Sequence, residues 1–127
     1  NLEIAQFMLE NEGMIVSTAR NGQEAVDAFV SSTSGTYDVI LMDIMMPTMG
    51  GLEATRMIRA SAHPDANTVP IFAMTANAFT DDIARSKKAG MNEHLTKPLN
   101  AKNVIQMIRK YIGKKEAAAN ASCEESL

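Results

Sequence analysis

Hydrophobic and polar positions follow two different patterns along the chain. Apolar residues recur on one helical face in segments at residues 2–9, 21–30, 52–58, 79–89 and 104–112. This period predicts amphipathic helices. Short runs rich in apolar and β-branched residues lie between or beside them, at residues 14–19, 37–42, 69–74 and 91–96. These runs lack a helical stripe and predict strands, of which 37–42 is almost continuously apolar, as in a strand buried on both faces.

The regular alternation of strand and helix predicts a single α/β domain with a doubly wound parallel sheet. Right-handed crossover connections place helices on both faces of such a sheet. The length of 127 residues suits one domain, and 46% hydrophobic with 21% charged residues is ordinary for a globular chain. We expect the domain to span residues 1–113, with Gly113 ending the last helix, and residues 114–127 to form a flexible tail.

Charge and cysteine content exclude several function classes. The net charge of −3 and the scattered basic residues argue against a nucleic-acid surface. Cys123 is the single cysteine, so neither an intrachain disulfide nor a four-cysteine zinc site can form, and we expect a cytoplasmic location. No apolar run approaches the roughly 18 residues of a membrane span, so direct membrane insertion is not expected.

Three polar residues of different types follow successive predicted strands. Asp43 follows the second run, Thr75 the third and Lys97 the fourth. The carboxyl ends of parallel strands meet at one edge of the sheet, where α/β proteins place their chemistry. A carboxylate there can act as a nucleophile toward phosphorus, while an ammonium and a hydroxyl stabilise the added charge.

Each of these residues also has an ordinary structural interpretation. Asp43 alone could form a turn, Thr75 could cap the following helix, and Lys97 could be a solvated surface lysine. The interpretation as a site therefore depends on all three lying at the same edge. By the same weighing, most methionines, including Met57, are predicted to fill the core, and His63 is predicted to be solvated surface.

Several motifs together resemble the receiver domain of two-component response regulators. They occupy residues 21–25 (Asn-Gly-Gln-Glu-Ala), 41–53, 74–78 (Met-Thr-Ala-Asn-Ala) and 89–98. The second begins Leu-Met-Asp and contains Met-Pro-Thr-Met-Gly-Gly, and the last ends in Thr-Lys-Pro. The resemblance covers residues 1 to about 113 and is strongest to receivers attached to hybrid histidine kinases. It implies a flavodoxin-like fold with strand order 2-1-3-4-5.

The resemblance also implies roles for individual residues. Asp43 corresponds to the phosphoacceptor, Thr75 and Lys97 to the residues that contact the phosphoryl group, and Thr75 and His94 to the switch positions. Many receivers carry Tyr or Phe where this chain has His94, so the switch is expected to be weaker or sensitive to pH, unless His94 is simply a partly exposed strand residue. The Lys97–Pro98 bond matches a position where the family often has a cis peptide.

The implied cofactor is Mg²⁺. Asp43 and the backbone carbonyl of Met45 would be its ligands, and the side chains of Met45 and Asn77 would tune the lifetime of the phosphate. The family's first strand, which is central in the sheet, and the acidic pair that follows it have no counterpart in this sequence. Three explanations stay open: a truncated sequence, which we favour, a strand supplied by another chain, or a sheet that closes imperfectly. Without the acidic pair, Mg²⁺ binding and phosphorylation are expected to be weak.

Three functions compete on these observations. The leading one is a signalling receiver that accepts a phosphoryl group from a phosphohistidine onto Asp43 and then switches partner binding. A pseudo-receiver that docks partners without being phosphorylated is the alternative. A hydrolase ranks last, because Met45 stands where a general acid would be needed. We therefore expect a phosphoacceptor domain rather than an enzyme, either free-standing or tethered to the membrane through a parent hybrid kinase. Its partner would be a histidine kinase or a histidine phosphotransfer domain, with homodimerisation or strand donation left open.

Overall fold

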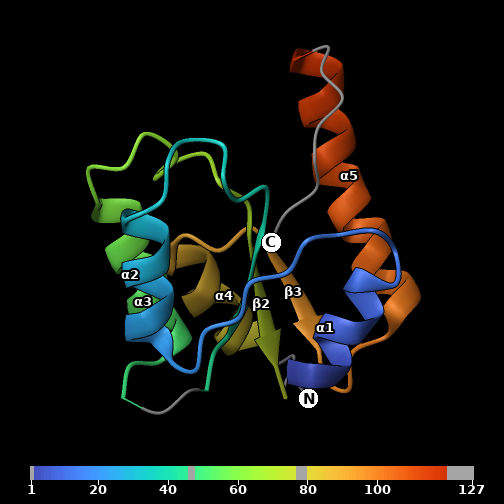
Figure 1. Ribbon diagram of the computed structural model, residues 1–127. Coiled ribbons are helices and arrows are strands. Elements are labelled where there is room, and N and C mark those ends of the chain that lie inside the picture. Colours follow the sequence, from blue (N-terminus) through green and yellow to red (C-terminus); the bar gives the residue numbers. More distant parts are fainter. Residues whose placement is uncertain (1, 46–47, 77–79, 120–127) are drawn as a thin grey trace.

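The computed structural model describes residues 2–45, 48–76 and 80–119. They form a three-stranded parallel sheet flanked by helices (Figure 1). In chain order the elements are α1 (Leu2–Glu10), α2 (Gly22–Val30), β1 (Ile40–Asp43), α3 (Gly51–Ala60), β2 (Ile71–Thr75), α4 (Thr80–Ala89), β3 (Glu93–Thr96) and α5 (Ala101–Ala119). Among the described helices, none is both long and apolar enough to cross a membrane.

The sheet has the order β1-β2-β3, with β2 in the middle. Asp43 pairs with Met74, and Thr75 pairs with Thr96. All five residues of β2 are buried, because helices cover both faces of the sheet and neighbouring strands cover both edges of β2. The register brings the carboxyl ends of the three strands to one edge, as the strand pattern predicts.

Two apolar clusters hold the helices against opposite faces of the sheet. One joins Leu9 of α1 and Ile108 of α5 to Phe72 of β2. The other joins Phe29 of α2 and Ile58 of α3 to the opposite face of the sheet. Figure 1 shows the same division, with α1 and α5 on one side and α2 and α3 on the other. The predicted doubly wound α/β arrangement is therefore confirmed.

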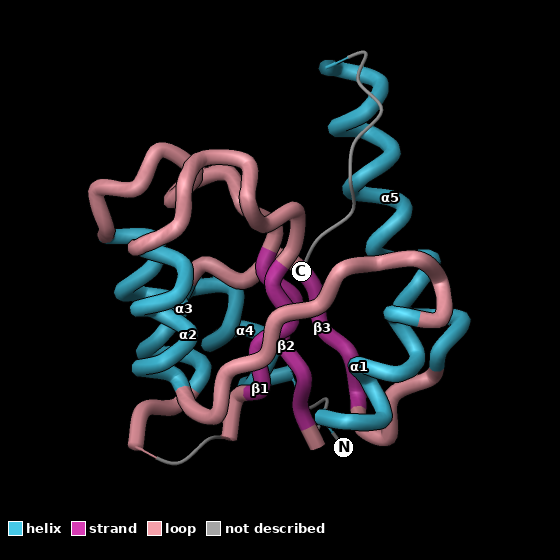
Figure 2. The backbone as a smooth tube through the Cα atoms, in the orientation of Figure 1, coloured by secondary structure: helices cyan, strands magenta, loops and turns pink. Residues whose placement is uncertain are grey.

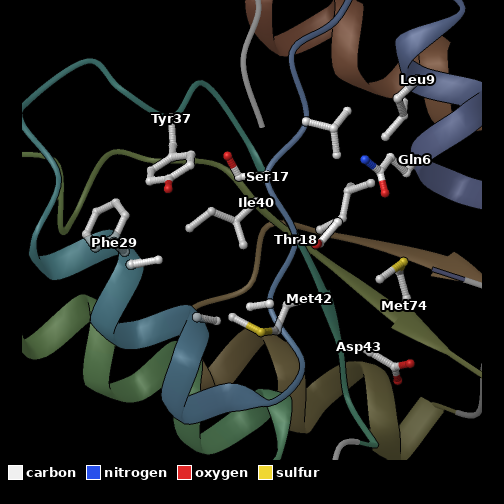
Figure 3. Close-up of a pocket in the computed structure, with 15 residues that line it drawn as sticks. Gln6, Leu9, Ser17, Thr18, Phe29, Tyr37, Ile40, Met42, Asp43 and Met74 are labelled. Atoms are coloured by element: carbon white, nitrogen blue, oxygen red, sulfur yellow. The ribbon is translucent and has the colours of Figure 1, made fainter. Parts of the chain in front are cut away.

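The predicted strand at 14–19 is wrong. The stretch has a single bridged residue, Ile15, and otherwise crosses between α1 and α2 as a loop (Figure 2). A groove with a cavity of about 150 Å³ separates it from β1 (Figure 3). The amides of Ile40 and Ile44 donate to carbonyls of the β2 side. Along a strand, the backbone N–H and C=O groups of alternate residues point to opposite neighbours. Leu41 and Asp43 therefore direct their backbone polar groups away from β2 and toward the groove. Among the described residues, the 14–19 stretch therefore belongs to no strand of the sheet.

The groove lies between residues 14–19 and β1, the two segments that the resemblance places on either side of the central strand. Its walls come from both apolar clusters, with Leu9 and Met74 from one and Phe29 and Met42 from the other. Asp43 lies at one end of it (Figure 3). The observed sheet therefore has three strands in the described residues, and the position that a central strand would occupy is an apolar groove.

Three smaller predictions are also wrong. Met57 is 40% exposed rather than part of the core, because Ala54, Thr55 and Ile58 form the buried face of α3. His63 is partly buried rather than a fully solvated surface residue: its Nδ1 accepts from the amide of Asp65, its Nε2 bonds the carbonyl of Ser32, and its ring packs on Phe29. The last helix does not end at Gly113 but continues to Ala119. A single glycine inside a helix costs only about 1 kcal/mol, and the residues after it are good helix formers.

Asn21 caps α2, as its position before the helix predicts. Its side chain accepts from the amide of Glu24 at 2.9 Å, and the Glu24 carboxylate accepts from the amide of Arg20. We expect Asn21→Ala to lower the free energy of unfolding by about 1 kcal/mol, since the amide of Glu24 in the first turn of α2 loses its side-chain acceptor. Asn67→Ala, in an exposed loop, is the matched control and should change it by less than about 0.5 kcal/mol in the same urea titration.

Candidate functional site

The carboxyl edge of the sheet brings Asp43 and Lys97 together. Asp43 is the last residue of β1, and Lys97 follows β3, so the two side chains come from strands on opposite sides of β2. The ammonium of Lys97 donates to Asp43 Oδ2, and the amide of Met45 donates to Asp43 Oδ1 at 3.0 Å. The side chains of Lys97 and Asp43 remain 33% and 26% exposed, respectively. This carboxylate is therefore oriented by donors on both oxygens and still accessible to another molecule.

Two glycines allow the chain to fold closely around Asp43. A Cβ on Gly51 would lie 2.2 Å from the carbonyl oxygen of Asp43, so only glycine fits where α3 begins. A Cβ on Gly22 would lie 2.4 Å from the carbonyl oxygen of Met49, which instead accepts from the amide of Gly22. The loop after Asp43 is thus fastened to the first turns of α3 and α2. Sequence reasoning identified the irregular loop but not these close approaches, for which the Gly-Gly pair and Asn21-Gly22 are the available signals.

Thr75 and Lys97 are linked through the backbone. The amide of Lys97 donates to the carbonyl oxygen of Thr75 at 2.8 Å. Thr75 is 8% exposed and lies one residue past Met74, the partner of Asp43. The Lys97–Pro98 peptide bond is cis, at the position where the resemblance places one. All three residues predicted from the strand ends therefore lie at the same edge of the sheet, and their roles toward a phosphoryl group remain predictions.

His94 is half-buried on β3, and its side chain is directed toward α4. Its Nε2 contacts the hydroxyl of Ser86. Burial lowers the pKa of His94 below its ordinary value of 6.5, and the positive charge of Lys87 lowers it further, while Glu93 opposes both effects. The contact with Ser86 was not predicted from the sequence, because Ser86 lies in a polar helix with nothing in its neighbourhood to distinguish it.

Glu93 joins β3 to α5. The hydroxyl of Tyr111 donates to its carboxylate at 2.7 Å, and the ammonium of Lys110 lies 3.7 Å from the same oxygen. Burial and this hydrogen bond raise the pKa of Tyr111 to about 12. Tyr111 also packs edge-on against Phe72, with ring centroids 5.1 Å apart. These contacts fix α5 beside the strand that carries His94 and leads to Lys97.

The described donors do not suit a tightly held magnesium ion. Mg²⁺ requires octahedral oxygen ligands and usually takes one or two carboxylates in addition to water and phosphate oxygens. Among the residues that the structure describes, no group of three His, Cys, Asp or Glu side chains is arranged to hold a metal. Asp43 is paired with a lysine, which competes with a cation. Met45 is 81% exposed, its backbone carbonyl remains a candidate ligand, and Asn77 lies outside the described residues.

The arrangement suits the attack of a carboxylate on an exposed phosphorus centre. Asp43 presents an accessible oxygen nucleophile, and Lys97 supplies a positive charge where negative charge would develop. Among the described residues near Asp43, no histidine or second carboxylate is placed as a general base: His94 bonds to Ser86, and His63 bonds to a loop. The described part of the site therefore combines an accessible carboxylate with a neighbouring positive charge.

Comparison with known proteins agrees with this fold. The family model of the response regulator receiver domain matches residues 1–109. The chain is 34% identical over 116 residues to hybrid signal transduction histidine kinase I of Dictyostelium discoideum and 35% identical over 114 residues to the sensor protein GacS of Pseudomonas syringae pv. syringae. The two alignments cover 90% and 89% of this chain but only 7% and 12% of the length of those proteins.

A solved structure is similar over most of the chain. The receiver domain of sensor histidine kinase PA1611 from Pseudomonas aeruginosa PAO1, which has a magnesium ion coordinated in its active site cleft, superposes with a TM-score of 0.79. The two are 35% identical, and the match covers 89% of this chain and 88% of that one. The chain has a flavodoxin-like parallel sheet, the family model matches most of its length, and the similar solved structure is itself a receiver domain. The chain therefore belongs to the response regulator receiver domain family.

Proposed function

We propose that this chain accepts a phosphoryl group from a phosphohistidine onto Asp43 and thereby changes the binding of a partner. The observation that carries the proposal is the accessible Asp43 carboxylate with the Lys97 ammonium beside it. An oxygen of Asp43 attacks phosphorus, the P–N bond of the phosphohistidine breaks, and the imidazole nitrogen keeps the bonding electron pair. The product is an acyl phosphate on Asp43.

The neighbouring residues have separate parts in this proposal. Lys97 exchanges its contact with the carboxylate for one with a phosphoryl oxygen, which offsets the added negative charge. Thr75 is the candidate hydroxyl donor, because its backbone already holds the amide of Lys97. The donor would be a histidine kinase or a histidine phosphotransfer domain. Membership of a larger hybrid kinase is part of the same proposal, since the chain matches only 7% of a hybrid signal transduction histidine kinase and 12% of a sensor protein.

A pseudo-receiver that is not phosphorylated is the second candidate function. The donor set around Asp43 favours it, because a single described carboxylate, already paired with Lys97, would hold Mg²⁺ weakly. We expect magnesium to bind this chain more weakly than it binds a receiver with several carboxylates. The relative with magnesium in its cleft provides the comparison protein for that measurement.

The test is an intact-mass measurement after incubation with acetyl phosphate and MgCl₂. The proposal predicts a mass increase of one phosphoryl group that is absent in Asp43→Asn, because the amide is not a nucleophile toward phosphorus. Asp27→Asn is the matched control: Asp27 is an exposed carboxylate on α2 that bonds Gln23, and its loss should leave the adduct intact. An adduct that persists in Asp43→Asn contradicts the proposed acceptor. The lack of any adduct, also from a phosphorylated histidine phosphotransfer domain, favours the pseudo-receiver.

A further inference from the structure

Thr48, in the loop that follows Asp43, has a strained backbone conformation. Its φ of 68° lies in the left-handed region, which is disfavoured for a β-branched residue because the Cβ crowds the backbone. The side chain of Thr48 is exposed, so its own burial does not offset this cost. The conformation is therefore imposed by backbone contacts of the neighbouring residues.

The start of α2 supplies one of these contacts. The amide of Gly22 donates to the carbonyl oxygen of Met49, the residue after Thr48, at 3.0 Å. Gly22 is buried, and a Cβ at this position would lie 2.4 Å from that oxygen and 2.9 Å from Met49 Cγ. Because the oxygen belongs to the backbone, no side-chain rotation could relieve this overlap. The loop is therefore held against α2 at a distance that requires a glycine.

A second backbone contact connects the held part of the loop to Asp43. The amide of Gly51, two residues beyond the carbonyl that α2 holds, donates to the carbonyl oxygen of Ile44 at 3.0 Å. Ile44 lies between Asp43 and Met45, and the Met45 amide donates to Asp43 Oδ1 at 3.0 Å. The start of α2 is thus linked by hydrogen bonds to the peptide that orients the carboxylate.

We propose that Gly22 is a positioning residue for Asp43, which holds the loop through the Met49 carbonyl and keeps Thr48 in its strained conformation. Without this anchor the loop relaxes at Thr48, and the Met45 amide loses its place beside the carboxylate. The start of α2 is then a point from which the acceptance of a phosphoryl group can be tuned. The effect on phosphorylation rests on the proposed function, whereas the effect on the carboxylate geometry does not.

Gly22→Ala tests the anchor in the full, unphosphorylated chain. Alanine is a better helix former than glycine, so a position without a close contact would gain stability. Here the added methyl group must displace the Met49 carbonyl, and we expect a lower urea midpoint and a shifted ¹H–¹⁵N signal of the Met45 amide. Gln23→Ala, at the next position of α2, is the matched control and should leave that signal in place. An unchanged Met45 signal in folded Gly22→Ala, or an equal shift in Gln23→Ala, would overturn the proposal.

Substitutions of Thr48 test the strain separately. Asparagine tolerates the left-handed region, whereas valine keeps the β-branched shape of threonine. We therefore expect Thr48→Asn to raise the urea midpoint and Thr48→Val to leave it nearly unchanged. Both variants replace an exposed side chain, so packing should change little. Equal midpoints of the two variants would contradict the strained conformation that the anchor is proposed to hold.

The double variant Gly22→Ala/Thr48→Gly separates positioning from stability. Glycine at residue 48 lets the loop move aside for the added methyl group, so the urea midpoint should recover. The loop stays displaced, and the initial rate of adduct formation with acetyl phosphate should remain 10- to 100-fold low, since a misplacement of about 1 Å can cost about 10²-fold. A rate that recovers together with the midpoint would show that Gly22 has only a structural role.

The same variants distinguish failure of this inference from failure of the proposed function. If the unsubstituted chain forms no adduct, the proposed function fails, and the Met45 signal alone decides whether Gly22 positions the carboxylate. If Gly22→Ala does not fold, the double variant supplies that signal. A Met45 signal in the folded double variant that matches the unsubstituted chain would then overturn the proposal.

Discussion

Replacing Lys97 by alanine is expected to slow the phosphorylation of Asp43 about 10²–10³-fold, the usual effect of removing one donor that stabilises developing negative charge. The Lys97 ammonium donates to Asp43 Oδ2 and is the described positive charge that contacts the carboxylate. Without it, the transition state and the acyl phosphate lose this neutralisation. The initial rate of adduct formation, followed by intact mass at a fixed phosphodonor concentration, measures the effect.

A fold control distinguishes this loss from unfolding. The Asp43–Lys97 pair is about a third exposed, so its removal should change the free energy of unfolding by no more than about 1 kcal/mol. Lys102→Ala, an exposed lysine in the first turn of α5, should leave the rate unchanged. If Lys97→Ala and Lys102→Ala are phosphorylated at the same rate, Lys97 does not contact the phosphoryl group.

The largest expected loss of stability comes from Phe72→Ala. Phe72 is the second residue of β2 and fully buried, packs against residues of α1 and α5, and meets the ring of Tyr111. Removing it leaves a cavity where the cluster on this face meets the sheet, at a cost of about 3–5 kcal/mol. Because domains of this size are stable by only about 5–15 kcal/mol, a large share of the stability should be lost. Urea unfolding followed by circular dichroism gives the value.

Phe7→Ala provides the matched control. It removes the same side chain from α1, where Phe7 is 73% exposed, and should change stability by less than about 0.5 kcal/mol. Equal effects of the two substitutions would mean that Phe72 is not the packing centre of this cluster. Tyr111→Phe, which keeps the ring but removes the hydroxyl bond to Glu93, separates ring packing from that hydrogen bond.

The residues that could be predicted from the sequence share a local signal. The apolar runs before Asp43 and Thr75 are strands that end at these two residues. Because the two strands are parallel, Asp43 and Thr75 lie at the same edge of the sheet. Asn21 was recognised as a cap because its partner, Glu24, is three residues away. A structural feature can therefore be predicted from the sequence when the residues that determine it lie within one helical turn or one strand.

The wrong predictions concern groups whose partners are distant in the chain. The stretch at 14–19 has the composition of a strand, but a strand forms only when a neighbour supplies hydrogen-bond partners, and a groove separates it from β1. His63 has the ordinary appearance of a loop residue, yet its bond to Ser32 and its contact with Phe29 hold it partly buried against α2. Met57 fits the apolar period, but the adjacent Ala54 and Ile58 occupy the buried face.

By itself, the amino-acid sequence determined the α/β class, the order of helices and the three strand-end residues, because hydrophobic period and strand-end polarity are encoded locally. Only the tertiary structure decided that Lys97 pairs with Asp43, that Gly51 must lack a side chain beside that strand, and that His94 meets Ser86. Each of these contacts joins residues from different elements. Their distances depend on how the helices pack against the sheet, which no single segment specifies.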